Sequence, residues 1–255
     1  MAGAIRFSIH GGGLKAGSPP LVLIHGSGGS RLHWPPQLRR HPIYRVFGLD
    51  LPGHGDSPGE GETTIDGYVK RVVEWLDEQG IERAVLVGHS MGGAIAMTTA
   101  LDEPRRVAGL VLMGTGGRLR VNEEILRATA DPIHFAETVD MVITWAFSDK
   151  TPERIIALAK MRMSETRPEV IHGDFMACNR FDICDLLPEI RVPSLILCGK
   201  QDRLTPLKYA NHLDEQIPES TLVLIEDAGH MVMLERPLEV AEAVSNFLES
   251  LVWYP

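Results

Sequence analysis

Residues 84–93 read Ala-Val-Leu-Val-Gly-His-Ser-Met-Gly-Gly, and this stretch decides the fold. Its first four residues are continuously apolar, as expected of a parallel strand that is buried on both faces. The segment from Gly88 to Gly92 fits the pattern G-x-S-x-G, in which a serine occupies a sharp turn between a strand and a helix. We therefore expect Ser90 to present its hydroxyl at a helix N-terminus, where partial positive charge favours a developing anion. A plain helix-capping serine is the alternative.

Short apolar runs of the same kind recur along the chain and predict further strands. Most are continuously apolar rather than alternating, which is typical of strands covered by helices on both sides. One more run at the N-terminus predicts an edge strand. The predicted strands are Leu21–Ile24, Tyr44–Leu49, Ala84–Val87, Val107–Met113, Ser194–Cys198 and Leu222–Ile225, with Ile5–Ile9 at the edge.

Helical patterns separate these runs. One ends at the stop signal Gly80 and a closing helix starts at Pro237. Residues 205–206 and 151–152 are both Thr-Pro, which we interpret as a helix cap followed by proline at the first helical position. Residues 117–188 contain helical patterns without a buried-strand run, and we interpret them as a helical insertion. Strands that alternate with helices indicate βαβ units.

The composition is that of a folded chain with a large core, because 44% of its 255 residues are hydrophobic and 23% are charged. Its formal net charge of −9 repels phosphate backbones, so we expect no nucleic-acid partner. The three widely spaced cysteines favour neither a disulfide framework nor a zinc site and suit a reducing cytoplasm. The N-terminus lacks a secretory pattern, and no apolar run is long enough to span a bilayer.

The sequence offers a base and an acid in the chain order that a nucleophilic serine requires. His230 follows the last predicted strand and lies C-terminal to Ser90. His89 is expected to point away from the site, because adjacent side chains diverge. Asp202 directly follows the strand at 194–198, so we expect it to orient the imidazole of His230. Asp227 is the competing acid, but it is too close in sequence to His230 to grip the ring at a good angle.

Acyl transfer by such a serine also needs N–H donors for the oxyanion. We expect one from Met91, just after the serine, and the other from Ser27 in the glycine-rich loop at 25–29, for which an ordinary glycine loop is the alternative. The string His-Gly-Gly-Gly at 10–13 follows the edge strand, so we interpret it as a surface turn. Metal-binding and nucleotide-binding patterns are missing from the sequence, and we expect neither a metal nor a cofactor.

Taken together, these motifs resemble those of the α/β-hydrolase fold superfamily over essentially the full chain. The resemblance implies an α/β fold with a mostly parallel eight-stranded sheet, helices on both faces and a helical lid inserted after the sixth strand. It also implies that no cofactor is used. We expect residues 1–116 and 189–255 to form the core and residues 117–188 to form the lid. The matching stretches are His25–Gly28, Asp50–Ser57, Gly88–Gly93, Gly199–Asp202 and Gly229-His230.

Within this superfamily the chain looks most like small carboxylesterases, cofactor-free haloperoxidases and hydrolases of aromatic ring-cleavage products. Serine at position 90 argues against the dehalogenases and epoxide hydrolases of this fold, which place an aspartate there. We expect a cytoplasmic serine hydrolase of small carboxylic esters, with Gly28, Trp145 and Met231 lining its substrate pocket. The alternatives are carbon–carbon bond hydrolysis of ring-cleavage products, lactone or thioester cleavage, and a non-catalytic ligand receptor on the same fold.

Overall fold

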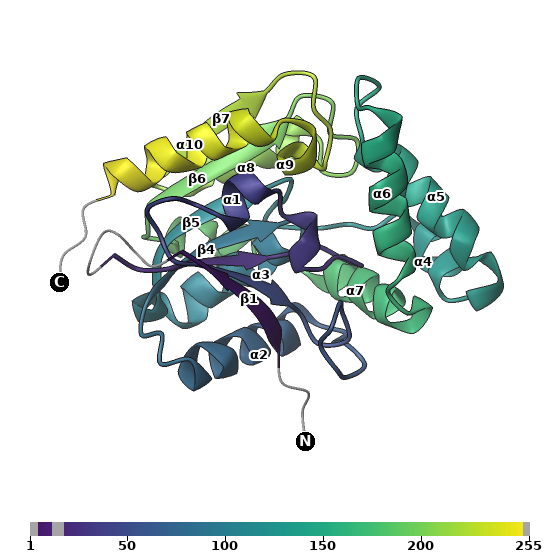
Figure 1. Ribbon diagram of the computed structural model, residues 1–255, viewed down its shortest axis with the longest axis horizontal. Coiled ribbons are helices and arrows are strands. Elements are labelled where there is room, and N and C mark those ends of the chain that lie inside the picture. Colours follow the sequence, from purple (N-terminus) through teal and green to yellow (C-terminus); the bar gives the residue numbers. More distant parts are fainter. Residues whose placement is uncertain (1–4, 12–17, 252–255) are drawn as a thin grey trace.

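A seven-stranded sheet organises residues 5–11 and 18–251, the part of the chain that the computed structural model describes. Its strand order is β1-β3-β2-β4-β5-β6-β7 (Figure 1). β1 runs antiparallel to β3, and every other neighbouring pair is parallel. The strands are β1 (Arg6–His10), β2 (Leu21–Ile24), β3 (Val46–Asp50), β4 (Ala84–His89), β5 (Val107–Met113), β6 (Ser194–Gly199) and β7 (Ser220–Ile225).

The sheet confirms the predicted α/β class and corrects its detail. β2 and β5 have the predicted bounds, and β1 is the predicted edge strand. The eighth strand that the resemblance implies does not occur within residues 5–11 and 18–251, where β1 itself pairs along the outer edge of β3. The helical insertion therefore follows the fifth strand of this sheet rather than the sixth.

Strand β2 shows why the apolar runs form a central sheet. All four of its residues are buried, and successive side chains point to opposite faces. Val22 and Ile24 belong to the core on one side of the sheet, while Leu21 and Leu23 belong to the core on the other. A strand with two buried faces has no room for polar alternation, so its sequence is continuously apolar.

Helices cover both faces of the sheet. α2, α3 and α8 pack on one face, and α1 and α10 pack on the other (Figure 1). α9 is a short turn of helix that precedes α10. The helices of these layers are α1 (Pro36–Arg39), α2 (Ile65–Glu78), α3 (Met91–Asp102), α8 (Leu207–Gln216), α9 (Val232–Glu235) and α10 (Pro237–Ser250).

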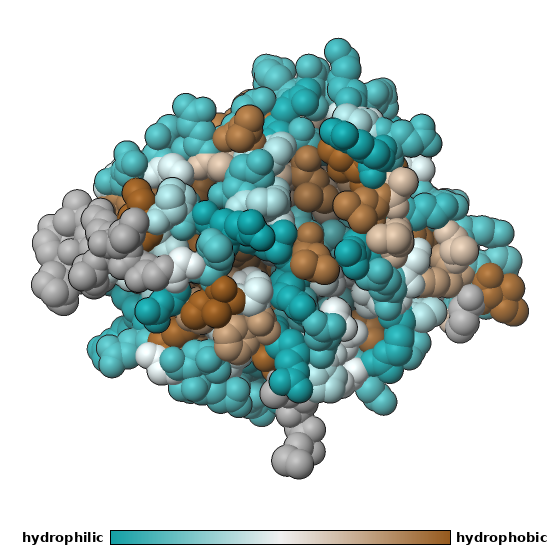
Figure 2. All heavy atoms as spheres, viewed as in Figure 1, coloured by the Kyte–Doolittle hydropathy of each residue, from teal (hydrophilic) through white to brown (hydrophobic). Residues whose placement is uncertain are grey.

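Four further helices lie between β5 and β6 and group at one end of the molecule (Figure 1). α4 contacts α7, and α5 contacts both α4 and α6. Hydrophobic side chains are visible over this region in Figure 2, and Leu158 and Met161 of α6 are about half exposed. The four helices are α4 (Glu123–Thr129), α5 (Phe135–Ala146), α6 (Glu153–Ser164) and α7 (Pro168–Arg180).

Both predicted Thr-Pro helix caps are wrong. α8 and α6 each begin after the proline, and neither has a side-chain cap hydrogen bond. The Thr205 hydroxyl donates instead to the buried Asp202 carboxylate, at 2.7 Å. The Thr151 hydroxyl donates to the buried Glu235 carboxylate, at 2.5 Å. A hydrogen bond to an ionised carboxylate is stronger than a neutral one, so these hydroxyls donate to the buried carboxylates. The tertiary contacts therefore outweigh the local capping preference.

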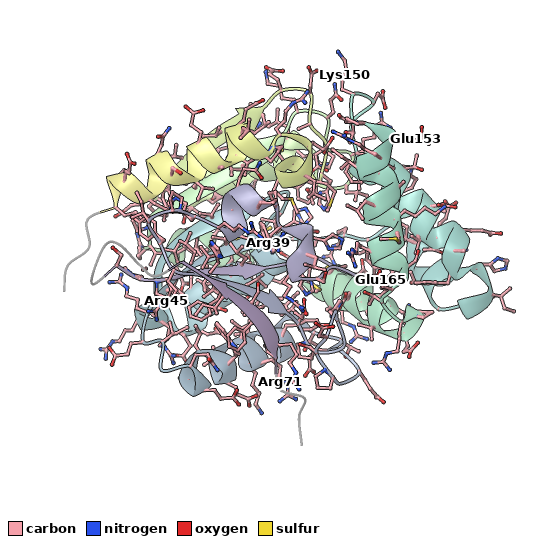
Figure 3. The ribbon with its side chains drawn as sticks, in the orientation of Figure 1. Arg39, Arg45, Arg71, Lys150, Glu153 and Glu165 are labelled. Carbon is pink, nitrogen blue, oxygen red and sulfur yellow. The ribbon has the colours of Figure 1, made fainter. Side chains whose placement is uncertain are left out.

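The outer surface carries most of the charge. Figure 3 shows the side chains of Lys150 and Glu153 projecting outward at the start of α6, and Arg71 projecting from α2. Across residues 5–11 and 18–251, no helix has the length and apolar composition needed to cross a membrane. All three cysteines, which lie in this part of the chain, are free thiols, in agreement with the prediction that they form no disulfide framework.

Candidate active site

Ser90 occupies a strained turn between β4 and α3. Its φ of 54° and ψ of −117° lie outside the regions that residues with a side chain ordinarily adopt, which costs about 1–3 kcal/mol. Two contacts from β5 and the loop after it hold this conformation. The Ser90 N–H donates to the Met113 carbonyl at 2.9 Å, and the Thr115 hydroxyl donates to the Ser90 carbonyl at 2.8 Å.

The two glycines of the G-x-S-x-G pattern are required by close backbone approach. A Cβ atom on Gly88 would overlap the carbonyl oxygen of Gly92, and one on Gly92 would overlap the carbonyl oxygen of Ile24. The opposing atoms are backbone atoms, so they cannot move aside as a flexible side chain would. The turn therefore presents Ser90 at the N-terminus of α3 only if both positions lack a side chain.

The structure brings His230 and Asp202 together beneath this turn. His230 Nδ1 lies 2.9 Å from Asp202 Oδ2, and the two side chains are 6% and 0% exposed. Because a carboxylate oxygen accepts, Nδ1 carries the proton, and Nε2 is left as the nitrogen available to a reacting group. Thr205 supports the pair, since its hydroxyl also lies 3.1 Å from His230 Nδ1.

Asp202 is held as a carboxylate by its donors. Burial by itself raises the pKa of Asp202, but the neighbouring His230 and the Thr205 hydrogen bonds outweigh burial and lower it below its usual value. The backbone N–H groups of Leu204 and Thr205 donate to Asp202 Oδ1 at 2.9 and 2.8 Å. The competing acid Asp227 is 46% exposed and pairs with Arg236 at 3.5 Å, away from the imidazole.

The loop that carries His230 is anchored to the end of α5 by the carboxylate of Glu235, which no motif in the sequence indicates. Glu235 accepts the N–H of Gly229 at 2.8 Å and the N–H of Ser148 at 2.9 Å. The His230 N–H itself donates to the Ala146 carbonyl at 2.8 Å. Because Ser148 is 87 residues away from Glu235, no local pattern around Glu235 reveals this contact.

His89 does not point away from the site, contrary to the expectation. Its Nε2 lies 3.0 Å from the carbonyl oxygen of His230, and the two ring centroids are 4.7 Å apart. Burial, together with the nearby His230, lowers the pKa of His89 to about 3. The ring is therefore neutral and donates its N–H to the His230 backbone, which makes it a support for the base and not a second base.

Ser27 and Met91 lie side by side, as the Ser27 hydroxyl is 3.7 Å from the Met91 sulfur. Within residues 5–11 and 18–251, neither backbone N–H has a hydrogen-bond acceptor. The next N–H in the loop, that of Gly28, is already occupied by the Asp174 carboxylate at 2.9 Å. Both N–H groups expected to serve the oxyanion are thus left without an acceptor in the described part of the chain.

A cavity of about 430 Å³ joins these groups. Ser90 and His230 both line it, although no hydrogen bond connects them directly in the described part of the chain. The three residues predicted to form the substrate pocket all line the cavity, namely Gly28, Trp145 and Met231.

The cavity wall is largely apolar, and the helical insertion supplies half of its lining residues. Two cations, Arg120 and Arg203, lie at its edge, where Arg120 pairs with Asp182 at 3.3 Å and Arg203 pairs with Asp149 at 2.8 Å. Across the described ranges, no three metal-ligating side chains cluster. The apolar lining residues include Leu119, Val121, Ile125, Val142, Ile143, Ala159, Met163 and Phe175.

Comparison with known proteins gives a family match and several relatives. Residues 21–243 match the alpha/beta hydrolase family. The dihydrolipoyllysine-residue acetyltransferase component of the acetoin cleaving system of Pseudomonas putida is 30% identical over 91% of this chain, which spans 64% of that protein. The pimeloyl-[acyl-carrier protein] methyl ester esterase of Pectobacterium carotovorum is 29% identical over 92% of this chain and 96% of its own length. A 2-hydroxy-6-oxononadienedioate/2-hydroxy-6-oxononatrienedioate hydrolase of a Pseudomonas species is 29% identical over 96% of this chain and 93% of its own length.

Solved structures of the same shape cover nearly the whole chain. A thermophilic esterase is 35% identical with a TM-score of 0.83, over 97% of this chain and 94% of that one. The enol-lactonase of Burkholderia xenovorans LB400 is 25% identical with a TM-score of 0.87, over 96% of both chains. The similarity therefore extends through both the sheet and the helical insertion.

Proposed function

Because the chain belongs to the alpha/beta hydrolase family, we propose that it hydrolyses carboxylic esters of small acyl substrates through a triad of Ser90, His230 and Asp202. The observation that carries this proposal is the buried 2.9 Å contact between His230 Nδ1 and Asp202 Oδ2, beside a cavity that Ser90 also lines. A strained serine and a buried histidine–aspartate pair cost stability, and such strain concentrates at functional sites.

The proposed reaction proceeds through an acyl-enzyme. His230 Nε2 takes the proton of Ser90 as its oxygen attacks the ester carbonyl. The N–H groups of Ser27 and Met91 stabilise the oxyanion, and His230 then protonates the leaving alcohol. Water, activated by His230, releases the acid in the second half of the reaction. Asp202 keeps the imidazole in the tautomer with Nδ1 protonated and stabilises the imidazolium.

The cavity supports an apolar acyl or alcohol group as the bound part of the substrate. Trp145 and Met231 contribute to its wall, and Gly28 leaves space at its floor. We propose that residues 117–188 serve as a lid over the core of residues 1–116 and 189–255, because they supply half of the residues that line the cavity. Closure of such a lid excludes water and strengthens the electrostatic contacts inside.

Lactone cleavage is the second candidate, because it uses the same acyl-enzyme and a solved relative is an enol-lactonase. Carbon–carbon bond hydrolysis of dicarboxylate ring-cleavage products needs a cation for the substrate carboxylate. Arg120 and Arg203, which line the cavity, are each about half exposed, and an exposed cation binds a carboxylate only weakly, which favours an uncharged ester. Rates on matched esters, thioesters, lactones and ring-cleavage products distinguish these substrates.

The test of the proposed function is Ser90→Ala. This variant should lower kcat for p-nitrophenyl butyrate by about 10⁴-fold or more, since it removes the nucleophile. Thermal unfolding should show that the variant keeps its fold. A fluorophosphonate probe should label only the wild type, whereas a non-catalytic receptor need not activate Ser90 for labelling. Ser164→Ala is the matched control, because that hydroxyl bonds to Lys160 within its own helix. Wild-type turnover by Ser90→Ala would refute the proposal.

A further inference from the structure

The carboxylate of Asp174, on α7 of the helical insertion, lies at the centre of a buried network. Its Oδ2 accepts the Gly28 N–H at 2.9 Å and contacts His54 Nε2 at 2.8 Å. Its Oδ1 accepts the Tyr68 hydroxyl at 2.5 Å. The side chains of Asp174 and His54 are both 0% exposed. One carboxylate of the insertion thus joins three separate segments of the core.

The acceptors that surround His54 make it the charged partner of Asp174 in a buried ion pair. His54 Nδ1 lies 3.0 Å from the Pro52 carbonyl oxygen and Nε2 lies against the Asp174 carboxylate, so both ring nitrogens face acceptors. Both must therefore carry protons, which makes the ring an imidazolium. Burial opposes this charge, but the Asp174 carboxylate outweighs burial and raises the pKa of His54. Removing one member of such a buried pair leaves the other uncompensated.

Asp174 also fixes the backbone next to Ser27. Its bond to the Gly28 N–H orients the peptide that links Ser27 to Gly28. The Thr166 hydroxyl of the insertion donates to the Gly28 carbonyl at 3.3 Å and orients the following peptide. Gly28 has a φ of 63°, and a Cβ there would lie 3.0 Å from the Ile171 side chain. The loop therefore rests directly on the insertion.

We infer that Asp174 is a positioning residue of the oxyanion hole, which couples α7 of the insertion to the loop that presents the Ser27 N–H. This inference rests on the proposed function. A donor in the oxyanion hole acts only when it is aimed at the position of the developing charge. The insertion thus contributes to catalysis through a hydrogen bond to the loop, in addition to forming the wall of the cavity.

The test compares three substitutions in the network. Asp174→Ala removes the contact to Gly28 and should lower kcat by about 10- to 100-fold with little change in KM, since loss of one oxyanion donor costs about 10²–10³-fold. Asp174→Asn keeps an acceptor for Gly28 without the charge, so its kcat should fall between those of Asp174→Ala and the wild type. Tyr68→Phe is the matched control, because it removes a donor from the same carboxylate and leaves the Gly28 bond in place.

A second measurement separates positioning from loss of stability. An alkyl trifluoromethyl ketone forms a hemiketal oxyanion on Ser90, and its affinity should fall by the same factor as kcat in Asp174→Ala. In Tyr68→Phe both quantities should stay close to wild type while the melting temperature falls. If Asp174→Ala does not fold, the comparison falls to Asp174→Asn and Tyr68→Phe. A lower kcat and a lower inhibitor affinity in Asp174→Asn than in Tyr68→Phe then support the inference.

Two outcomes overturn the inference. One is a wild-type kcat and inhibitor affinity in Asp174→Ala, and the other is an equal loss of both in Asp174→Asn and Tyr68→Phe. Neither outcome bears on the proposed function, provided that Ser90→Ala is inactive. An active Ser90→Ala variant would instead remove the proposed function itself.

Discussion

The buried ring of His33 makes the stability of the protein depend on pH in a definite direction. His33 Nδ1 accepts the N–H of Ser30 at 3.0 Å, so the single ring proton resides on Nε2 and the ring is neutral. Burial, together with the nearby charge of Arg162, lowers the pKa of His33 to about 4. In the unfolded chain a histidine titrates at about 6.5. Between these values the unfolded state binds a proton that the folded state does not, so the free energy of unfolding falls as the pH drops.

The size of this loss follows from the two pKa values. One pKa unit corresponds to about 1.4 kcal/mol, and pH 5 lies about 1.5 pH units below the unfolded value. His33 therefore lowers the free energy of unfolding by about 2 kcal/mol between pH 7 and pH 5. His89 adds a loss of the same sign, since its pKa is lowered further. His54 acts in the opposite direction, because its raised pKa gives stability that is complete below about 6.5 and is lost as the pH rises through the folded value.

His33→Asn isolates this contribution, because the asparagine oxygen can accept the Ser30 N–H without titrating. Urea unfolding at pH 7 and pH 5 should show that the wild type loses about 2 kcal/mol more than the variant. The exposed His10 is the control, since His10→Asn changes a side chain that folding does not bury. Equal losses in the wild type and His33→Asn would refute the reasoning, because they would mean that folding does not oppose protonation of His33.

Three further substitutions test the geometry of the site. Gly92→Ala should destabilise the protein by about 3 kcal/mol or more in urea unfolding, because the new Cβ meets the Ile24 carbonyl oxygen, and wild-type stability would contradict the required close approach. Thr205→Val should lower kcat by about tenfold with KM unchanged, since it removes about 1.4 kcal/mol of support from Asp202, and an unchanged kcat would exclude that support. Glu235→Gln should lower the free energy of unfolding by about 1–3 kcal/mol and the melting temperature by a few degrees in calorimetry, because an amide has only one oxygen for the two N–H groups. An unchanged melting temperature would show that one acceptor suffices.

Most of the fold could be predicted from the sequence, because a strand buried on both faces has a composition that no exposed segment shares. β2 and β5 have their predicted bounds, and β4 and β6 extend only slightly beyond theirs. The seven apolar runs correspond to the seven strands of the sheet, including the edge strand β1. The eighth strand was implied only by the family resemblance, and it does not occur within residues 5–11 and 18–251.

The candidate site divides in the same way. Ser90, Asp202 and His230 each follow a predicted strand directly, and because parallel strands end at one edge, the sequence places them near one another. Asp174 and Glu235 could not be predicted. Gly28 and Asp174 are 146 residues apart, and Ser148 and Glu235 are 87 residues apart. These partners meet only because the insertion folds back onto the core.

The two wrong helix caps and the two residues that the sequence did not reveal share one physical cause. Loops at the carboxyl edge of the sheet leave backbone N–H groups that need acceptors once they are buried. Here Asp50, Asp174, Asp202 and Glu235 supply them, and each accepts at least one loop N–H. The same carboxylates also take the hydroxyls of Thr205 and Thr151, which explains why local capping rules failed at both. For Asp174 and Glu235, the carboxylate and a loop N–H that it accepts lie far apart in the sequence. A buried carboxylate is stable only while its donors remain, and a loop that loses its carboxylate loses its position as well as its stability.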